Sequence, residues 1–382
     1  MKNITQSLQD LKQQNRYRQR EIMHSPQGRC VALEQGRYLS FCSNDYLGLA
    51  NDERVKQAFI EGVERFGAGS GAAHLITGHF EPHHELEQAL AKHTGRSRAL
   101  LFSTGYMANL GLIDALTSRG DVVMEDRLNH ASLIDGGLYS RASFVRFKHA
   151  DLEDLEQQLQ KSRSQQALIV TDGVFSMDGD IAPLAEMNIL AEKYNARLLV
   201  DDAHGMGVLG KTGGGVCEML SLEEDDKPII MGTLGKGFGV FGAFVAGSEE
   251  LIEWLIQRAR TYVFTTALPP AVATAALASL NIIQTEPQRR THLQLLIDTF
   301  RQRVTEMGLQ LMPSQTPIQP IIVGDEAKAL IWSEALKKQG ILVKAIRPPT
   351  VPVGTSRLRI TFSASHTMDD LQQLLSALEQ LP

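Results

Sequence analysis

The sequence is poor in cysteine, with three among 382 residues. Cys30, Cys42 and Cys217 lie too far apart for a paired zinc motif or a disulfide framework, so we expect no metal site and a reducing compartment. The amino terminus, MKNITQSLQDLKQQNRYRQREIM, also lacks the apolar core of a secretory signal. These absences predict a cytoplasmic protein.

The chain also lacks an excess of one charge and a long hydrophobic run. Its 44 acidic and 38 basic residues are scattered, which excludes the basic stripe of a nucleic-acid or membrane surface. The longest apolar stretch, residues 228–248, contains Lys236 and several glycines, so it does not predict a transmembrane helix. We expect small molecules or other proteins as partners.

What the sequence does contain is an alternation of short apolar runs with stretches of helical periodicity. The runs predicted to be strands are residues 98–103, 121–126, 166–173, 196–202 and 227–233. Strands that alternate with helices predict an α/β fold with a mainly parallel sheet covered on both faces.

The two ends of the chain follow other patterns. The start predicts a polar helix and a hairpin over VALEQGRYLSF, and the end predicts long helices around strands such as IQPIIVG, ILVKAI and SRLRITF. We therefore divide the chain into an N-terminal arm (1–45), a large domain (46–280) and a small C-terminal α+β domain (281–382).

Two glycine motifs of the form G-x-G-x-x-G suggest a dinucleotide site. In the true fingerprint the glycines follow a strand and open a helix. The first copy runs into KTGGG, which we do not expect to start a stable helix, and the second runs into GAFVAG, which is typical of a strand. We therefore disfavour a nicotinamide-dependent oxidoreductase but keep it as an alternative. The glycines are Gly205, Gly207 and Gly210, and Gly237, Gly239 and Gly242.

Lys236 is isolated: between Pro228 and Ser248 no other side chain carries a formal charge, and glycine flanks it on both sides. Apolar surroundings disfavour the charged ammonium, so the neutral amine becomes available to form a Schiff base with an aldehyde cofactor. Thr233, three residues earlier, could bind a phosphate at the same turn. From this segment alone, a strand-end lysine that reaches solvent is an equally good interpretation.

Other segments offer what pyridoxal phosphate (PLP) requires. The cofactor needs a carboxylate at its pyridinium nitrogen. Asp201 and His204 follow a predicted parallel strand at its carboxyl end, where ligands bind, although an acidic pair capping a turn is the alternative. The Gly105 turn before a helix that starts near Tyr106 offers amide donors for phosphate.

Two further polar residues follow predicted strands. His130 could stack on a pyridine ring, and Ser176 could bind a cofactor oxygen. A helix cap and an ordinary turn serine are the alternatives for these two residues.

Nine motifs together make the chain resemble the α-oxoamine synthases, which are PLP enzymes of the aspartate-aminotransferase fold type. The resemblance covers nearly the whole chain. Its motifs are SNDYLGLA (43–50), GAGSGAAHLITG (67–78), HHELEQALA (83–91), STGYMAN (103–109), DRLNHAS (126–132), DGVFSMDGD (172–180), DDAHGMGVLG (201–210), TLGKGFG (233–239) and GTSRLRIT (354–361).

The resemblance implies a role for each candidate residue. Lys236 would hold PLP as a Schiff base, Asp201 would bind the ring nitrogen, and His130 would stack on the ring and contact substrate. Arg359 would clamp the amino-acid carboxylate through its planar guanidinium. The remaining implied ligands are His204 and Ser176 for the cofactor oxygen, Gly105, Tyr106 and Thr233 for the phosphate, and Asn44, Thr350 and Arg18 for the substrate. Arg16 and Arg20 are the alternatives to Arg18.

Within the family, AIRPPTVPVGTSRLRIT (345–361) favours a member that condenses L-alanine with a pimeloyl thioester of coenzyme A or acyl carrier protein, in biotin biosynthesis. Arg347 stands where glycine-using relatives usually have an aromatic residue, and it suits an acyl chain with an acidic end. A sibling of the aminoketobutyrate ligase or aminolevulinate synthase type is the alternative.

The resemblance also implies a homodimer, and the intact Lys236 disfavours a catalytically silent partner subunit.

Overall fold

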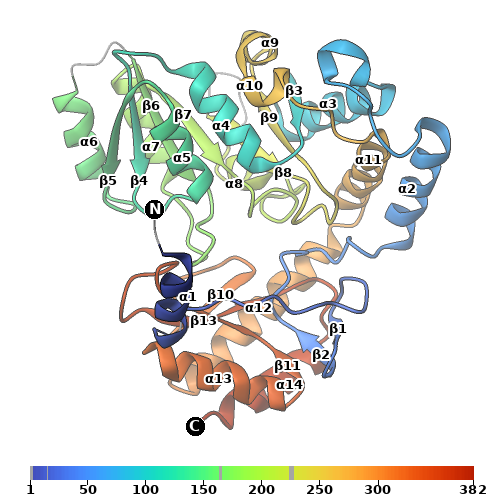
Figure 1. Cartoon of the computed structure of the whole chain (residues 1–382), viewed down its shortest axis with the longest axis vertical. Helices are drawn as coiled ribbons and strands as arrows, with labels where there is room; N and C mark the ends of the chain where they lie inside the picture. Colours follow the sequence, from blue (N-terminus) through green and yellow to red (C-terminus); the bar gives the residue numbers. More distant parts are fainter. Residues whose placement is uncertain (1–2, 15, 163–165, 223–227) are drawn as a thin grey trace. The chain divides into compact units, whose positions relative to one another are not determined.

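The computed structural model describes residues 3–14, 16–162, 166–222 and 228–382 (Figure 1). The chain divides into two compact units, which we treat separately. Unit 1 contains residues 1–48, 177–180 and 291–382, and unit 2 contains residues 49–176 and 181–290. Over the described ranges, no helix has both the length and the apolar character needed to cross a bilayer. The three-part domain division stays a prediction.

Unit 2 is built on a seven-stranded sheet with the order β3-β9-β8-β7-β6-β4-β5. Neighbours from β8 to β5 are parallel, and β9 is antiparallel to both of its neighbours. The predicted α/β class with a mainly parallel sheet is therefore confirmed. The strands are β3 (Arg98–Phe102), β4 (Val122–Asp126), β5 (Ser143–Phe147), β6 (Ala167–Asp172), β7 (Arg197–Asp201), β8 (Ile229–Thr233) and β9 (Ala243–Gly247).

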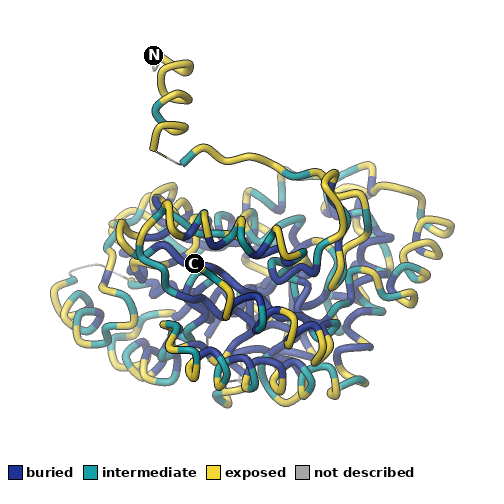
Figure 2. The backbone as a smooth tube through the Cα atoms, turned by 90° about the horizontal axis from the view of Figure 1, so that it is seen from below, coloured by how far each residue is buried: buried dark blue, intermediate teal, exposed yellow. Residues whose placement is uncertain are grey.

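The strands form because their apolar runs are buried on both faces of the sheet. In Figure 2 the buried stretches of the backbone are dark blue, whereas the helix at the amino terminus is almost entirely yellow, the colour of exposed residues. All five residues of β4 and of β9 are buried. The helices of unit 2 are α2 (Glu53–Phe66), the single π-helical turn η1 (His74–Gly78), α3 (Glu81–Thr94), α4 (Gly105–Leu116), α5 (Ala131–Tyr139), α6 (Leu152–Lys161), α7 (Leu184–Lys193), α8 (Gly215–Met219), α9 (Glu249–Arg258), α10 (Arg260–Val263) and α11 (Pro270–Thr285).

Four of the five predicted strands are confirmed as β3, β4, β6 and β7. The fifth is confirmed as β8, although Lys227 at its predicted start lies outside the described residues. Strand β5 was not predicted. This edge strand has two exposed residues, Ser143 and Arg146, so it lacks the continuous apolar run of the central strands.

Unit 1 combines two three-stranded sheets with helices, and the predicted small α+β character is confirmed. Its strands are β1 (Cys30–Leu33), β2 (Gly36–Ser40), β10 (Ile318–Gly324), β11 (Ile341–Leu342), β12 (Lys344–Ile346) and β13 (Ser356–Thr361). Its helices are α1 (Ile4–Gln13), α13 (Glu326–Lys338) and α14 (Met368–Glu379), together with most of α12 (Gln288–Glu306).

The predicted hairpin in this unit is confirmed by the antiparallel pair β1 and β2. The prediction of one strand over ILVKAI is wrong. The segment divides at Val343: β11 pairs with β2 in one sheet, and β12 pairs with β13 in the other.

The expectation that KTGGG cannot start a helix is also wrong, because α8 begins at Gly215. The protein's own carboxylates bind the backbone donors at this turn. Asp202 Oδ2 accepts the N–H of Val216 at 2.7 Å, and Glu218 accepts the N–H groups of Thr212 and Gly214. These contacts leave no amide cradle for a pyrophosphate, so the nicotinamide alternative remains disfavoured.

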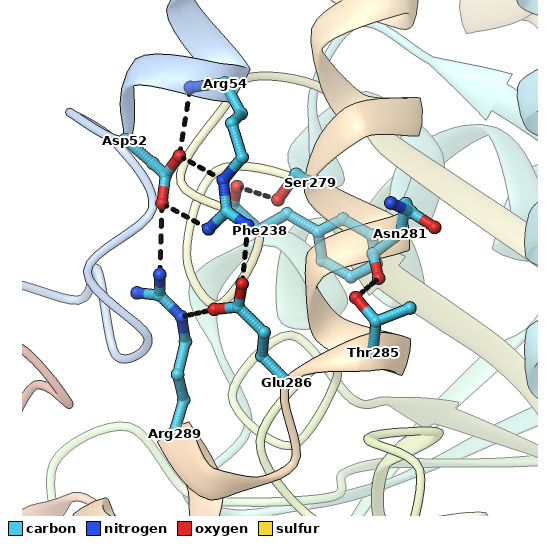
Figure 3. A network of polar contacts seen from close by, with 8 residues as sticks. All are labelled: Asp52, Arg54, Phe238, Ser279, Asn281, Thr285, Glu286 and Arg289. Carbon is cyan, nitrogen blue, oxygen red and sulfur yellow. Dashed lines mark hydrogen bonds and ion pairs between the residues drawn. The ribbon is translucent and has the colours of Figure 1, made fainter.

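A network of charged side chains joins the start of α2 to the end of α11 (Figure 3). Asp52 caps α2 by accepting the N–H of Arg54, and its carboxylate also binds the guanidinium groups of Arg54 and Arg289. Glu286 binds the same two arginines. The contacts with Arg54 lower the pKa of Asp52, so the Asp52 carboxylate keeps its negative charge down to acidic pH.

Candidate functional site

The candidate site residues of unit 2 gather at the carboxyl edge of its parallel strands. Asp172 and Asp201 are the last residues of β6 and β7 and face each other in register. His130 follows β4 and is the N-cap residue of α5, and Lys236 follows β8. Because the carboxyl ends of parallel strands share one edge, four separate segments deliver these side chains to the place where α/β proteins bind ligands.

Lys236 is half-buried, and its Nζ lies 2.9 Å from Nε2 of the buried His204. The loop is held in shape by backbone hydrogen bonds from Leu234 to Gly242 and from Val240 to Leu234. A Cβ on Gly237 would lie 2.5 Å from the carbonyl oxygen of Met206. The glycine beside the lysine is therefore required by close backbone packing.

A buried hydrogen-bond chain connects Asp201 to His130. The Asn109 amide nitrogen donates to Asp201 Oδ2 at 2.8 Å and to Ser132 Oγ at 2.9 Å. The Ser132 hydroxyl therefore has its own hydrogen free to donate to His130 Nδ1, 2.8 Å away, and the Ser132 N–H points at the same nitrogen. This pattern assigns Nδ1 as an acceptor and places the proton of neutral His130 on Nε2.

Asp172 adds a second acid to this network. Its Oδ2 accepts the N–H of His130 at 2.7 Å. Burial, followed by the nearby Asp201 charge, raises the pKa of Asp172 well above its ordinary value, which favours the protonated form of Asp172. Burial is also the main cause that lowers the pKa of His130, which keeps the imidazole neutral.

The predicted phosphate residues lie at the start of α4 and at the end of β8. Thr104 caps α4 by accepting the N–H of Met107, and the first helical N–H groups, on Gly105 and Tyr106, have no intrahelical acceptor. Tyr106 donates its hydroxyl to Asp135. Thr233 accepts the N–H of Gly235 at 3.2 Å. Ser176 lies in the turn after β6 and is half-buried.

The predicted carboxylate clamp lies in unit 1. Arg359 is buried on β13, and both of its terminal nitrogens donate to Asn44 Oδ1, at 3.3 and 3.2 Å. Tyr46 donates to the same oxygen, and burial raises the pKa of its phenol to about 12. Two predicted substrate residues therefore contact each other.

The other predicted substrate residues form a second group in unit 1. Arg18 donates to Thr350 Oγ1 at 3.0 Å, and the Thr350 N–H donates to the Arg347 carbonyl. Arg16, the neighbouring alternative to Arg18, pairs instead with Glu326. The geometry therefore distinguishes the two arginines, while the substrate role of Arg18 stays a prediction.

Three residues of this cluster were not predicted from the sequence: Asn109, Ser132 and Asp172. Asn109 lies one helical turn after Gly105, and Ser132 lies two residues after His130, a spacing at which serine bonds the local backbone. These two spacings are the features of the sequence that could have indicated Asn109 and Ser132. The contact with Asp201 joins residues 92 positions apart and could not be predicted from spacing.

A cavity of about 590 Å³ lies elsewhere, near the amino ends of β7 and β8. Its lining includes Arg197, Ile229 and Trp254. Since the polar cluster lies at the carboxyl edge, this cavity is not the candidate site.

The polar residues of unit 2 fit PLP. The Lys236 amine can bond an aldehyde, Asp201 offers a carboxylate, and the start of α4 offers amide donors. The Asn109 Oδ1 atom is buried without a hydrogen-bond partner among the described residues, so the cluster has an unused acceptor.

Comparisons with known proteins agree with this fit. A family model described as aminotransferase class I and II matches residues 37–378. A protein of Cellvibrio japonicus (strain Ueda107) named 8-amino-7-oxononanoate synthase is 56% identical over 378 residues, which cover 99% of this chain and 95% of that protein.

Two solved structures are also similar. A serine palmitoyltransferase from S. paucimobilis with a bound PLP–myriocin aldimine has a TM-score of 0.93 and 33% identity, covering 98% of this chain and 96% of its own. An 8-amino-7-oxononanoate synthase from Francisella tularensis has a TM-score of 0.78 and 32% identity, covering 90% and 97%. The chain therefore belongs to the class I and II aminotransferase family, within the group of relatives named 8-amino-7-oxononanoate synthase.

Proposed function

We propose that this chain is a PLP-dependent acyltransferase of biotin biosynthesis. It condenses L-alanine with a pimeloyl thioester and releases 8-amino-7-oxononanoate, carbon dioxide and the free thiol carrier. The observation that carries the proposal is the Lys236 amine against His204, on the same sheet edge as the Asp201 carboxylate. The name shared by relatives that are 55–57% identical supports this choice of substrates.

The residues of unit 2 hold the cofactor in this proposal. Lys236 would bond its aldehyde carbon, Asp201 would bind the ring nitrogen, and the N–H groups at Gly105 and Tyr106 would bind its phosphate. When bound, PLP supplies an electron sink that stabilises negative charge at the amino-acid Cα. The Asp201 carboxylate is positioned for this contact because the Asn109 amide and the Ala203 N–H each donate to one of its oxygens.

The proton and the carboxylate of alanine are handled by different side chains. Once alanine is bound, Lys236 Nζ is released from the cofactor, and the free amine would take the Cα proton and later return a proton to the same carbon. The Arg359 guanidinium binds the carboxylate, with its position set by Asn44. The Nε2–H of His130 is the donor for a substrate oxygen. Arg18, Thr350 and Arg347 line the acyl-chain side.

We also propose a cytoplasmic homodimer. In unit 2 the large apolar side chains of Ile76, Phe241 and Phe264 are 75%, 52% and 72% exposed, and burying such side chains against a partner would be favourable. A second copy of the chain is the partner that the family resemblance implies.

The test is a product assay with four substrate pairs: alanine or glycine, each with a pimeloyl or an acetyl thioester. We expect 8-amino-7-oxononanoate with alanine and the pimeloyl donor, and little turnover of the other pairs. A preference for glycine and acetyl donors would move the chain to a glycine-using sibling. Running the pimeloyl arm with coenzyme A and with acyl carrier protein identifies the carrier.

A further inference from the structure

Three potential metal ligands gather in unit 2 at the start of α3. His79 precedes the helix, and His84 and Glu87 lie three residues apart on one of its faces. One ligand atom from each lies within 4.8 Å of the others. The histidines are exposed and Glu87 is half-buried, so the cluster is open to solvent on one side.

Each end of the cluster is oriented by a buried neighbour. His79 Nδ1 lies 2.9 Å from Nδ1 of His74, which is itself stacked on Tyr262 with a centroid distance of 5.0 Å. This contact leaves His79 Nε2 for an outside ligand. Glu87 Oε1 accepts the Leu101 N–H at 2.9 Å, which leaves Glu87 Oε2 for an outside ligand. Such supporting hydrogen bonds are typical of metal-binding histidines and carboxylates.

The nearby His83 is not part of this set. Its Nδ1 accepts the N–H of Phe80 at 3.0 Å, and its Nε2 donates to the Leu268 carbonyl at 2.7 Å. With both ring nitrogens engaged by the backbone, His83 has a structural role at the start of α3.

The chemistry of the cluster suits a cation. Glu87 offers a carboxylate, and His79 and His84 offer imidazoles, which bind metal ions in their neutral form.

We propose that His79, His84 and Glu87 bind one divalent transition-metal ion, such as Zn²⁺ or Co²⁺, that braces the η1 turn against α3. Two imidazoles and one carboxylate suit a borderline-soft ion, with water completing its coordination. The proposal replaces the expectation of no metal site, which considered cysteine ligands alone. It goes beyond the proposed function, because none of the three residues is assigned to the cofactor or substrates.

The test titrates Co²⁺ and Zn²⁺ into the cofactor-loaded full chain after chelator treatment, using calorimetry and the visible spectrum of Co²⁺. We expect saturable binding of one ion. His84→Ala should weaken it at least about tenfold, whereas His24→Ala, which removes an exposed histidine of unit 1, should leave it unchanged.

Glu87→Gln separates the proposed site from chance binding by surface histidines. Glutamine can still accept the Leu101 N–H but has no charged oxygen for the ion, so binding should again weaken about tenfold or more. The proposal is overturned if the unaltered protein binds no ion. It is equally overturned if His84→Ala and Glu87→Gln both bind as tightly as the unaltered protein.

Discussion

At the scale of single residues, the protonation of His130 is set by the neighbours that surround it. Asp201 must accept hydrogen bonds, so the Asn109 amide must donate to it, and Ser132 in turn donates to His130 Nδ1. Asn109 and Ser132 are therefore positioning residues, which act through His130 and Asp201.

Ser132→Ala tests this chain of donors. Losing one neutral hydrogen bond of about 1 kcal/mol should shift the His130 tautomer and slow turnover up to about tenfold. Histidine ¹⁵N spectra should show the Nε2–H tautomer in the unaltered protein and a mixture in the variant. Ser140→Ala, which removes a buried hydroxyl bonded to the Gly137 carbonyl, is the matched control. A His130 spectrum identical in all three proteins would refute the assignment.

Glu125 is a second residue with a testable charge state. It is fully buried on β4, and its Oε1 has no hydrogen-bond partner among the described residues. Burial raises its pKa from the ordinary 4.5 to about 8. The protonated form is thus favoured by folding, so its stabilising effect is complete below pH 4.5 and is lost as pH rises through 8.

Glu125→Gln should remove this pH dependence. The free energy of unfolding of the variant minus that of the unaltered protein should be larger at pH 8 than at pH 5, as measured by denaturant unfolding at both pH values. An equal stability difference at the two pH values would contradict the raised pKa of Glu125.

At the scale of elements, α8 depends on glycine where its first turn meets Asp202. Gly215 has φ 90°, and a Cβ there would lie 1.9 Å from Asp202 Oδ2, the atom that caps the helix. The glycines of this loop provide space for a carboxylate of the protein itself, and their resemblance to a nucleotide fingerprint is coincidental.

Gly215→Ala should therefore cost about 3 kcal/mol or more of unfolding free energy, from the positive φ and the clash together. Gly67→Ala is the control: Gly67 has φ 81° but open space around it, so strain alone should cost about 1 kcal/mol. Equal losses in the two variants, measured by denaturant unfolding, would show that the contact with Asp202 is unimportant.

A helix or strand could be predicted from the sequence where its cause lies in its own residues, and could not where it depends on residues distant in sequence. The central strands were predicted because burial on both faces demands continuous apolar runs, as in β4 and β7. The division of ILVKAI between two sheets depends on pairing with β2 and β13, which are distant in sequence. For the same reason Lys236, an isolated charge, could be found from sequence, whereas Asn109 could not.

At the scale of the whole molecule, the two units carry different parts of the proposed chemistry. Unit 2 contains Lys236, Asp201 and His204, the proposed cofactor residues, and unit 1 contains Arg359 and Asn44, the proposed carboxylate ligands. The proposed decarboxylative condensation requires both sets of residues.

The most direct test follows the carboxyl carbon of alanine. Purified protein is given L-[1-¹³C]alanine and a pimeloyl thioester, and the gas and the product are analysed by mass spectrometry. We expect the label to leave as ¹³CO₂ and the 8-amino-7-oxononanoate formed to carry none of it. Retention of the label in an acylated product, or no label in carbon dioxide, would refute the proposed condensation.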